Sequence, residues 1–221
     1  MSPEFAGFPP AALEFYEQLA DNNNREWWQR NKATYEEAVR APIEALVAEA
    51  GAEGQVKVFR PYRDTRFSQG KSPIKEAQGA AVTVEDAIAY YVQINAAGLF
   101  VGGGWYAPVG QQVATYRGAV DGPAGVLLER ILAKLAKAGF EIDGDPVKTR
   151  PRGYDSDNPR IDLLRNRRLV VHKDYGSPEW LHTRETLTVV KKDWKAITPL
   201  IEWLVDHVGP GEDPGFLAPE D

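Results

Sequence analysis

Residues that could bind or transform an anion gather in one short basic run, which reads Arg-Pro-Tyr-Arg-Asp-Thr-Arg-Phe-Ser-Gln-Gly-Lys-Ser-Pro-Ile-Lys over 60–75. Residues 57–75 carry six lysines or arginines and one aspartate, which gives this stretch a formal charge of +5. Clustered cations repel one another unless an anion offsets them, and guanidinium groups hold phosphate or carboxylate oxygens in pairs. The run therefore predicts a site for an anionic ligand.

One aspartate and four cations of this run are the strongest candidates. In an extended chain Asp64 and Arg66 point to one side and Arg63 to the other. Asp64 would then orient Arg66 as a fork for the ligand, although an Arg–Asp pair that closes the loop explains the same residues. Lys71 and Lys75 flank a Ser-Pro turn and would complete a cationic pocket, although each alone is equally well explained as a solvated loop lysine.

A second basic stretch, residues 148–173, carries eight lysines or arginines and three aspartates. Arg150 and Arg152 would meet the first run across a shared cleft, which would explain why two segments far apart in the sequence are both positive. Asp162 and Arg165 are three residues apart, so on a helix they share a face, and a structural ion pair is the preferred interpretation.

The composition limits the classes of function. The chain of 221 residues has a formal net charge of −6 and a pI near 5.2, which disfavours indiscriminate binding to DNA. It contains no cysteine, so disulfides, thiolate catalysis and Cys-ligated zinc are excluded. The start carries no secretory apolar region and no apolar run approaches a membrane span, so we expect a cytoplasmic protein without a membrane partner.

Metal and cofactor sites have little support in the sequence. The three histidines, His172, His182 and His207, show neither metal-ligand spacing nor a nucleophile partner, and we predict no metal site and no cofactor. Magnesium held by Asp64 or Asp162 alone is left open, because magnesium sites need few protein ligands.

Hydrophobic periodicity predicts an α+β protein rather than a regular βαβ fold. A first helix is expected before residue 22. A second is expected after Asn22–Asn24, which would cap it, and Pro42 would kink or divide it. Further helices are expected over 111–138, over 160–167, and from Ser177-Pro178 to Val208. Strands are expected over Val56–Tyr62, Ile88–Ile94, Leu99–Val101, twice within Phe140–Thr149 about an Asp-Gly turn, and over Leu169–His172. We therefore expect a single domain over residues 1–208, with a small, mostly antiparallel sheet packed by N- and C-terminal helices, and a loose acidic Gly/Pro-rich tail over 209–221.

The triple glycine Gly102–Gly104 matches neither a dinucleotide fingerprint nor a Walker motif. A bulge or tight passage next to a strand is the preferred interpretation. The alternative is that its backbone N–H groups approach an anion. Trp105 and Tyr106 follow directly, and we expect them to pack in the core rather than stack on a ligand.

Five ordered motifs resemble one known family. They are Asn22–Trp28, Tyr62–Ser68, Lys71–Pro73, Tyr91–Gly104, and the segment from Pro151–Tyr154 through Pro159–Arg165. Together they resemble the bacterial family catalogued as domain of unknown function 2461, over roughly residues 5–208. The resemblance implies a single-domain protein and no particular activity. Where the family pattern has Asp-Lys-Ser-Pro-Tyr-Lys, this chain has Gly-Lys-Ser-Pro-Ile-Lys over 70–75, so the acid and the phenol of that motif are missing.

The leading functional hypothesis is recognition of a phosphate-bearing or other anionic molecule in a basic cleft, such as a nucleotide or a nucleic-acid end. The anion contacts would be Arg63, Arg66, Lys71, Lys75, Arg150 and Arg152. One alternative is an enzyme that acts on a phosphoester or nucleotide at the same cleft, with Asp64 or Asp162 as base or magnesium ligand. Another is a protein-interaction module whose basic loop docks an acidic partner. The sequence does not decide between them, nor does it fix the oligomeric state.

Overall fold

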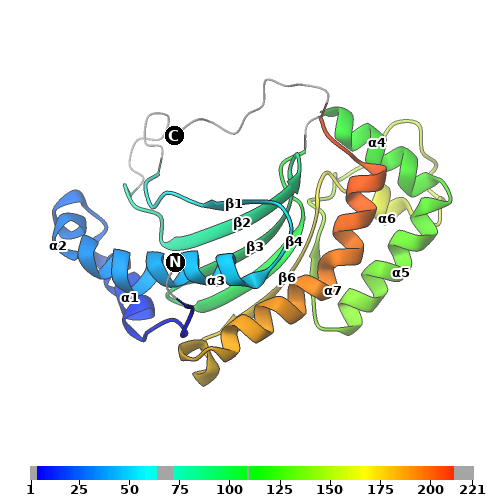
Figure 1. Cartoon of the computed structure of the whole chain (residues 1–221). Coiled ribbons are helices and arrows are strands. Elements are labelled where there is room, and N and C mark those ends of the chain that lie inside the picture. Colours follow the sequence, from blue (N-terminus) through cyan, green and yellow to red (C-terminus); the bar gives the residue numbers. More distant parts are fainter. Residues whose placement is uncertain (1–3, 64–71, 109, 212–221) are drawn as a thin grey trace. The chain divides into compact units, whose positions relative to one another are not determined.

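The computed structural model describes residues 4–63, 72–108 and 110–211. Its helices are α1 (Ala11–Asn22), α2 (Arg25–Tyr35), a π-helical turn (Glu36–Arg40), α3 (Ala41–Ala50), α4 (Gly110–Asp121), α5 (Ala124–Lys137), α6 (Ile161–Leu164), a 3₁₀ turn (Glu179–His182) and α7 (Glu185–His207). Its strands are β1 (Gln55–Val58), β2 (Ala77–Glu85), β3 (Ile88–Asn95), β4 (Gly98–Trp105), β5 (Glu141–Asp143) and β6 (Leu169–Gly176). The strands form one antiparallel sheet in the order β1-β2-β3-β4-β6-β5 (Figure 1), which confirms the α+β class.

Local signals in the sequence account for the N-terminal helices. The side chain of Asn24 accepts a hydrogen bond of 2.9 Å from the backbone N–H of Trp27, so the expected cap at the start of α2 is confirmed. The chain then passes through the π-helical turn, and Pro42 lies in the first turn of α3, where its missing N–H costs no helical hydrogen bond. Gly51 ends α3 in the left-handed conformation.

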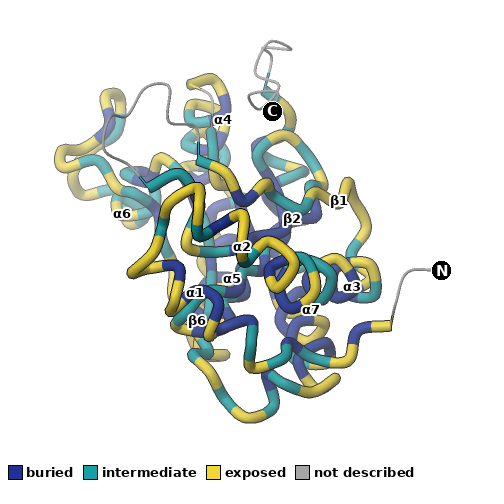
Figure 2. The backbone as a smooth tube through the Cα atoms, turned by 90° about the vertical axis from the view of Figure 1, so that its left-hand side faces the viewer, coloured by how far each residue is buried: buried dark blue, intermediate teal, exposed yellow. Residues whose placement is uncertain are grey.

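Strand β3 shows the predicted alternation. Ile88, Tyr90, Val92 and Ile94 are all buried on one face of the sheet. Tyr91 and Gln93 lie between them on the opposite face and are half-buried. Figure 2 shows the contrast between buried β2 and the exposed edge strand β1. Strand β2 was not predicted from the sequence, although most of its residues are buried.

The expected hairpin within residues 140–149 is wrong. Only β5 forms there, and it pairs with β6 in an antiparallel register that places Ile142 opposite Val171. The carbonyl of Gly144 instead accepts hydrogen bonds from the N–H groups of Arg167 and Arg168, at 2.9 and 3.2 Å. The segment after β5 therefore pairs with the chain just before β6 rather than folding back on itself.

Two helix boundaries also differ from the sequence prediction. The helix expected over 111–138 is two helices, α4 and α5, separated at Gly122-Pro123. Pro178 precedes a 3₁₀ turn, and the long helix α7 begins only at Glu185. The three-four spacing of α7 is confirmed, since Leu187, Val190, Trp194, Ile197, Ile201, Leu204 and Val208 are all buried.

The described residues divide into two compact units. The first comprises those of Met1–Val82, Tyr91–Val101 and Lys173–Lys195, and the second those of Thr83–Tyr90, Gly102–His172 and Ala196–Asp221. The expected single domain over residues 1–208 therefore stays a prediction. Most of the expected tail, from residue 212 on, lies outside the described residues. None of the helices in the described part of the chain combines the length and apolarity needed to cross a membrane.

The triple glycine lies inside β4 rather than after it, and it packs against backbone. A Cβ on Gly102 would lie 2.6 Å from the carbonyl oxygen of Val171, and one on Gly104 would lie 2.2 Å from that of Leu169. Gly104 also has a φ of +136°, a conformation that other residues rarely adopt. The tight-passage interpretation of this motif is confirmed. Trp105 is buried as expected, whereas Tyr106 is exposed.

Substitution of Gly104 by alanine should destabilise the protein by about 2–3 kcal/mol, because the new methyl group overpacks β6 and strains the backbone. Gly118→Ala is the matched control. A Cβ there meets no atom within 4 Å, and alanine is a better helix former by about 1 kcal/mol. Urea denaturation of both variants measures the difference. Equal stability of the two would contradict the close packing of Gly104.

Candidate functional site

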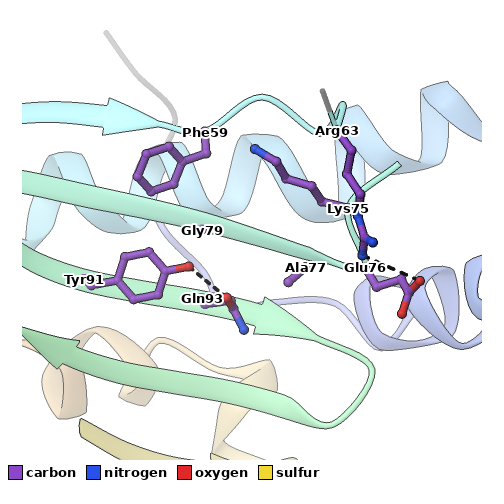
Figure 3. Close-up of a pocket in the computed structure, with 8 residues that line it drawn as sticks. All are labelled: Phe59, Arg63, Lys75, Glu76, Ala77, Gly79, Tyr91 and Gln93. Atoms are coloured by element: carbon purple, nitrogen blue, oxygen red, sulfur yellow. Dashed lines mark hydrogen bonds and ion pairs between the residues drawn. The ribbon is translucent and has the colours of Figure 1, made fainter. Parts of the chain in front are cut away.

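A pocket of about 280 Å³ lies within the first unit and contains two of the predicted anion contacts. Its lining residues come from the segment between β1 and β2, from β2 itself and from β3 (Figure 3). They are Phe59, Arg63, Lys75, Glu76, Ala77, Gly79, Tyr91 and Gln93. The structure therefore brings Arg63 and Lys75 together beside aromatic and amide side chains that the sequence analysis did not select.

A buried carboxamide fixes the Phe59 wall of the pocket. The side chain of Gln78 donates hydrogen bonds of 2.8 Å to the backbone carbonyls of Phe59 and Gly79. It accepts one of 2.5 Å from the phenol of Tyr35 on α2. The N–H of Phe59 in turn donates to the carbonyl of Gly79 at 3.0 Å. Phe59 is thus held against β2 although it lies beyond the end of β1.

Backbone pairing positions the two cations. The N–H of Arg63 donates to the carbonyl of Pro73 at 2.9 Å, and the N–H of Lys75 donates to that of Pro61 at 2.7 Å. The outgoing and returning parts of the basic run therefore lie side by side at the pocket. Arg63 and Lys75 project from this pair of segments toward Glu76 and Phe59 respectively (Figure 3).

The asparagine cluster before α2 anchors the same pair of segments. Asn23 donates to the carbonyl of Ile74 at 2.9 Å and accepts from its N–H at 3.1 Å. Ile74 is buried, so both of these backbone groups would otherwise lack water. The indole of Trp28 donates to the hydroxyl of Tyr62 at 3.2 Å. Asn23 thus has a structural role beyond the helix cap that the sequence predicted for this cluster.

Lys75 has no carboxylate partner among the described residues. Its ammonium lies 5.9 Å from the centre of the Phe59 ring, and within the described residues it makes no ion pair. Burial lowers the pKa of Lys75, and the positive charges of Arg63 and Lys57 lower it further. Arg63 has a carboxylate partner, Glu76, at 3.8 Å, but the exposed fractions of the two side chains are 35% and 50%, so this contact is weak.

The other end of the pocket is formed by an aromatic ring and an amide. A Cβ on Gly79 would lie 2.3 Å from the hydroxyl of Tyr91, so the phenol lies directly over this glycine. The hydroxyl donates to the side-chain carbonyl of Gln93 at 2.8 Å (Figure 3). Burial raises the pKa of Tyr91 to about 12, which keeps the phenol protonated and neutral. This end offers hydrogen bonds and a ring face without charge.

The remaining candidates of the first basic run, Asp64, Arg66 and Lys71, lie outside the described residues. Their roles in anion binding or catalysis stay predictions. The missed lining residues Phe59, Tyr91 and Gln93 carry no charge signal. Gly79 was the signal in the sequence that could have indicated this pocket, because a glycine inside a strand often marks a close approach of another group.

The candidates of the second basic stretch belong to the second unit. Arg150 is exposed, donates to the carbonyl of Tyr154 at 2.8 Å and lies 3.9 Å from Asp155. Arg152 is exposed, and no described residue pairs with its side chain. Whether these two arginines meet the first basic run stays a prediction.

The weak catalytic candidate Asp162 forms the expected pair with Arg165, at 3.8 Å, and its side chain is 93% exposed. Both residues line a second pocket of about 340 Å³. Arg165 also donates to the carbonyls of Val147 and Lys148, at 2.9 and 3.1 Å, so most of its donors are already in use. The structural interpretation of the pair is confirmed.

Three further arginines of the second stretch are bound to internal acceptors. Arg160 donates to the carbonyl of Val120 at 2.6 Å and to that of Asp121 at 2.9 Å. Arg167 pairs with Asp145 at 2.6 Å and Arg168 with Asp143 at 2.5 Å. Much of the positive charge of this stretch therefore holds the loops around β5 and the end of α4.

Histidines and carboxylates do not gather in the described residues, where no group of three or more could hold a metal ion. The ring of His182 instead hydrogen-bonds the carbonyl of Phe8 at 2.8 Å. His172 lies 3.5 Å from Glu141 on the neighbouring strand.

The fold and the pocket define an α+β protein with a six-stranded antiparallel sheet and two basic side chains beside an aromatic pocket. A family model described as conserved hypothetical protein (DUF2461) matches residues 11–203. This match covers most of the chain, so the protein belongs to that family, as the motifs indicated. None of the curated proteins matches the chain.

Removal of the Asn23 side chain should loosen the base of the pocket. Asn23→Ala breaks two hydrogen bonds to buried backbone groups of Ile74, so we expect a loss of about 1–3 kcal/mol in the free energy of unfolding. Asn22→Ala is the control, because that exposed side chain donates only to the carbonyl of Gln18 within its own helix. Chemical denaturation compares them. A loss no larger than that of Asn22→Ala would refute the anchoring role.

Proposed function

We propose that this protein binds a small phosphate-bearing or otherwise anionic ligand in the pocket formed by Phe59, Arg63, Lys75, Tyr91 and Gln93. The ligand's anionic group lies between the ammonium of Lys75 and the guanidinium of Arg63. In this proposal the protein is a bacterial, cytoplasmic binding protein that needs no metal.

The observation that carries the proposal is the environment of Lys75. A half-buried ammonium with a lowered pKa, close to a second cation, is an arrangement that costs free energy in the empty protein. An anion in the pocket removes that cost, because it supplies the opposite charge in a partly dehydrated place where charge-assisted hydrogen bonds are strong. The three charged side chains that line the pocket, Arg63, Lys75 and Glu76, sum to one positive charge.

Binding without catalysis is the form of the hypothesis that the described residues support best. Asp162, one of the two candidates for a base, is almost fully exposed and paired with an arginine. A catalytic carboxylate is more often buried in a pocket where its pKa is shifted.

Inorganic phosphate at ten times its dissociation constant should stabilise the protein by about 1.4 kcal/mol, which raises the Tm by roughly 3–6 °C. Lys75→Met should weaken phosphate about 10-fold, because it removes a charged donor. Lys192→Met is the matched control, since Lys192 is an exposed lysine of α7 and its loss changes the net charge equally. Thermal unfolding with a phosphate titration measures both. A wild-type Tm that phosphate leaves unchanged, or equal effects of the two variants, would refute the site.

Anion binding should also depend on pH in a defined direction. The protonated ammonium of Lys75 binds the anion, so affinity should fall as pH rises through the pKa of Lys75, which lies below the ordinary 10.5. Sulfate is the suitable probe, because its charge does not change in this range. Lys75→Arg should keep its affinity to higher pH, since a guanidinium stays protonated. Titration calorimetry between pH 7 and 10.5 compares the two proteins, and identical profiles would exclude Lys75 as the titrating contact.

A further inference from the structure

We infer that the ligand of this pocket is a nucleoside monophosphate, whose phosphate meets Lys75 and Arg63 and whose base lies against Tyr91 and Gln93. This inference rests on the proposed anion site and adds the chemistry of the ligand's other end. It is drawn from the uncharged half of the pocket, which an inorganic anion would leave unused.

The first argument is the ring face of Tyr91. Because Gly79 has no side chain, the phenol end of Tyr91 lies down on β2 rather than standing out from the sheet. The hydroxyl end of the ring covers the glycine, the ring of Phe100 meets the Tyr91 ring edge-on with centres 6.0 Å apart, and Tyr91 also lines the pocket. The ring of Phe59 lies 6.2 Å away at an interplanar angle of 42°, too close for a third ring to enter between them. A flat base would therefore lie against these rings rather than between them, and contact with an aromatic side chain serves every base.

The second argument is a polar pair of fixed sense. The side-chain carbonyl of Gln93 accepts from the hydroxyl of Tyr91, which leaves the amide NH₂ of Gln93 as a donor and a lone pair on the phenol oxygen as an acceptor. No described residue takes the amide hydrogens of Gln93. A donor next to an acceptor complements the edge of a nucleobase, where a ring nitrogen or carbonyl that accepts stands next to an N–H that donates.

The third argument is the spacing of the two ends. Arg63 and Lys75 come from the segment between β1 and β2, and Tyr91 and Gln93 come from β3 (Figure 3). The Lys75 ammonium lies 5.9 Å from the centre of the Phe59 ring, which lies 6.2 Å from that of Tyr91, so at most about 12 Å separates the ammonium from the Tyr91 ring. A nucleotide spans such a distance because its sugar separates base from phosphate. Ala77, which also lines the pocket, has only a methyl side chain and leaves room for the sugar.

The size and charge of the molecule favour a free nucleotide over a nucleic-acid end. The pocket of about 280 Å³ is at the lower limit for small-molecule sites. The chain as a whole carries a net charge of −6, which repels a polyanion.

Titration calorimetry of the full-length protein with three probes tests the inference: uridine 5′-monophosphate, ribose 5-phosphate and inorganic phosphate. We expect the nucleotide to bind at least about 5-fold more tightly than ribose 5-phosphate, from stacking alone. If uridine 5′-monophosphate and ribose 5-phosphate bind equally tightly and inorganic phosphate also binds, the base contact is refuted and the proposed anion site is retained. If none of the three binds, both proposals fail.

Two conservative variants locate the base. Gln93→Met removes the donor and Tyr91→Phe removes the acceptor while keeping the ring. Each should weaken the nucleotide roughly 3- to 10-fold and leave inorganic phosphate unchanged. Lys75→Met should weaken all three probes instead. If Gln93→Met and Tyr91→Phe both keep the nucleotide affinity and the melting temperature of the wild type, the placement of the base is overturned.

A fourth probe, a 5′-phosphorylated oligonucleotide, separates the two sources of a nucleoside phosphate. We expect it to bind no more tightly than the mononucleotide, because the pocket holds one nucleotide and the net charge opposes the rest. Affinity more than about 10-fold above that of the mononucleotide, falling steeply with salt, would overturn the assignment of a free nucleotide.

Discussion

The pocket depends on one buried carboxamide, that of Gln78, which is only 1% exposed. It connects Tyr35 of α2, the carbonyl of Phe59 beyond β1, and the carbonyl of Gly79 in β2. The bonds to Tyr35 and Gly79 are buried and the bond to Phe59 is partly buried, and a buried polar group left unpaired costs about 1–3 kcal/mol. The position of Phe59 over β2 follows from this satisfied network. The segment that carries Lys75 then runs past the Phe59 ring, and the ammonium of Lys75 lies over that ring.

The two basic stretches look alike in the sequence, yet their cations do different things. In the second stretch Arg160, Arg165, Arg167 and Arg168 donate to backbone carbonyls or pair with aspartates, so they hold loops together without a repeating hydrogen-bond ladder. In the first, Lys75 lines a pocket together with a second cation, Arg63, whose charge lowers the pKa of Lys75. A guanidinium has five donors and a planar fork, which suits it to bridging carbonyls. Charge density alone therefore does not distinguish a binding cation from a structural one.

Parts of the fold with a strong period were predictable from the sequence. The alternation over Ile88–Ile94 and the three-four spacing of α7 each place bulky apolar residues on a single face, and burial of that face decides the structure. The prediction of a hairpin about Gly144 was wrong because a favourable turn sequence does not determine which segment pairs with the strand before it. Here the carbonyl of Gly144 accepts from the backbone N–H groups of Arg167 and Arg168 just before β6. Helix breaks at Gly122-Pro123 and the 3₁₀ turn after Pro178 are local events that periodicity over longer windows averages out.

The small residues of β2 explain both why this strand was not predicted from the sequence and why the pocket can form beside it. Its sequence, Ala-Gln-Gly-Ala-Ala-Val-Thr-Val-Glu, begins with small residues of low β-propensity, and neither face shows an alternating apolar pattern there. Those small residues, Ala77 and Gly79, are the floor on which Tyr91 lies and over which the cations project. A bulky residue at position 79 would have made the strand easier to recognise and would have displaced Tyr91. The charge of Arg63 and Lys75 was visible in the sequence, but their neighbours on β3 follow only from the strand order β1-β2-β3, which long-range pairing sets.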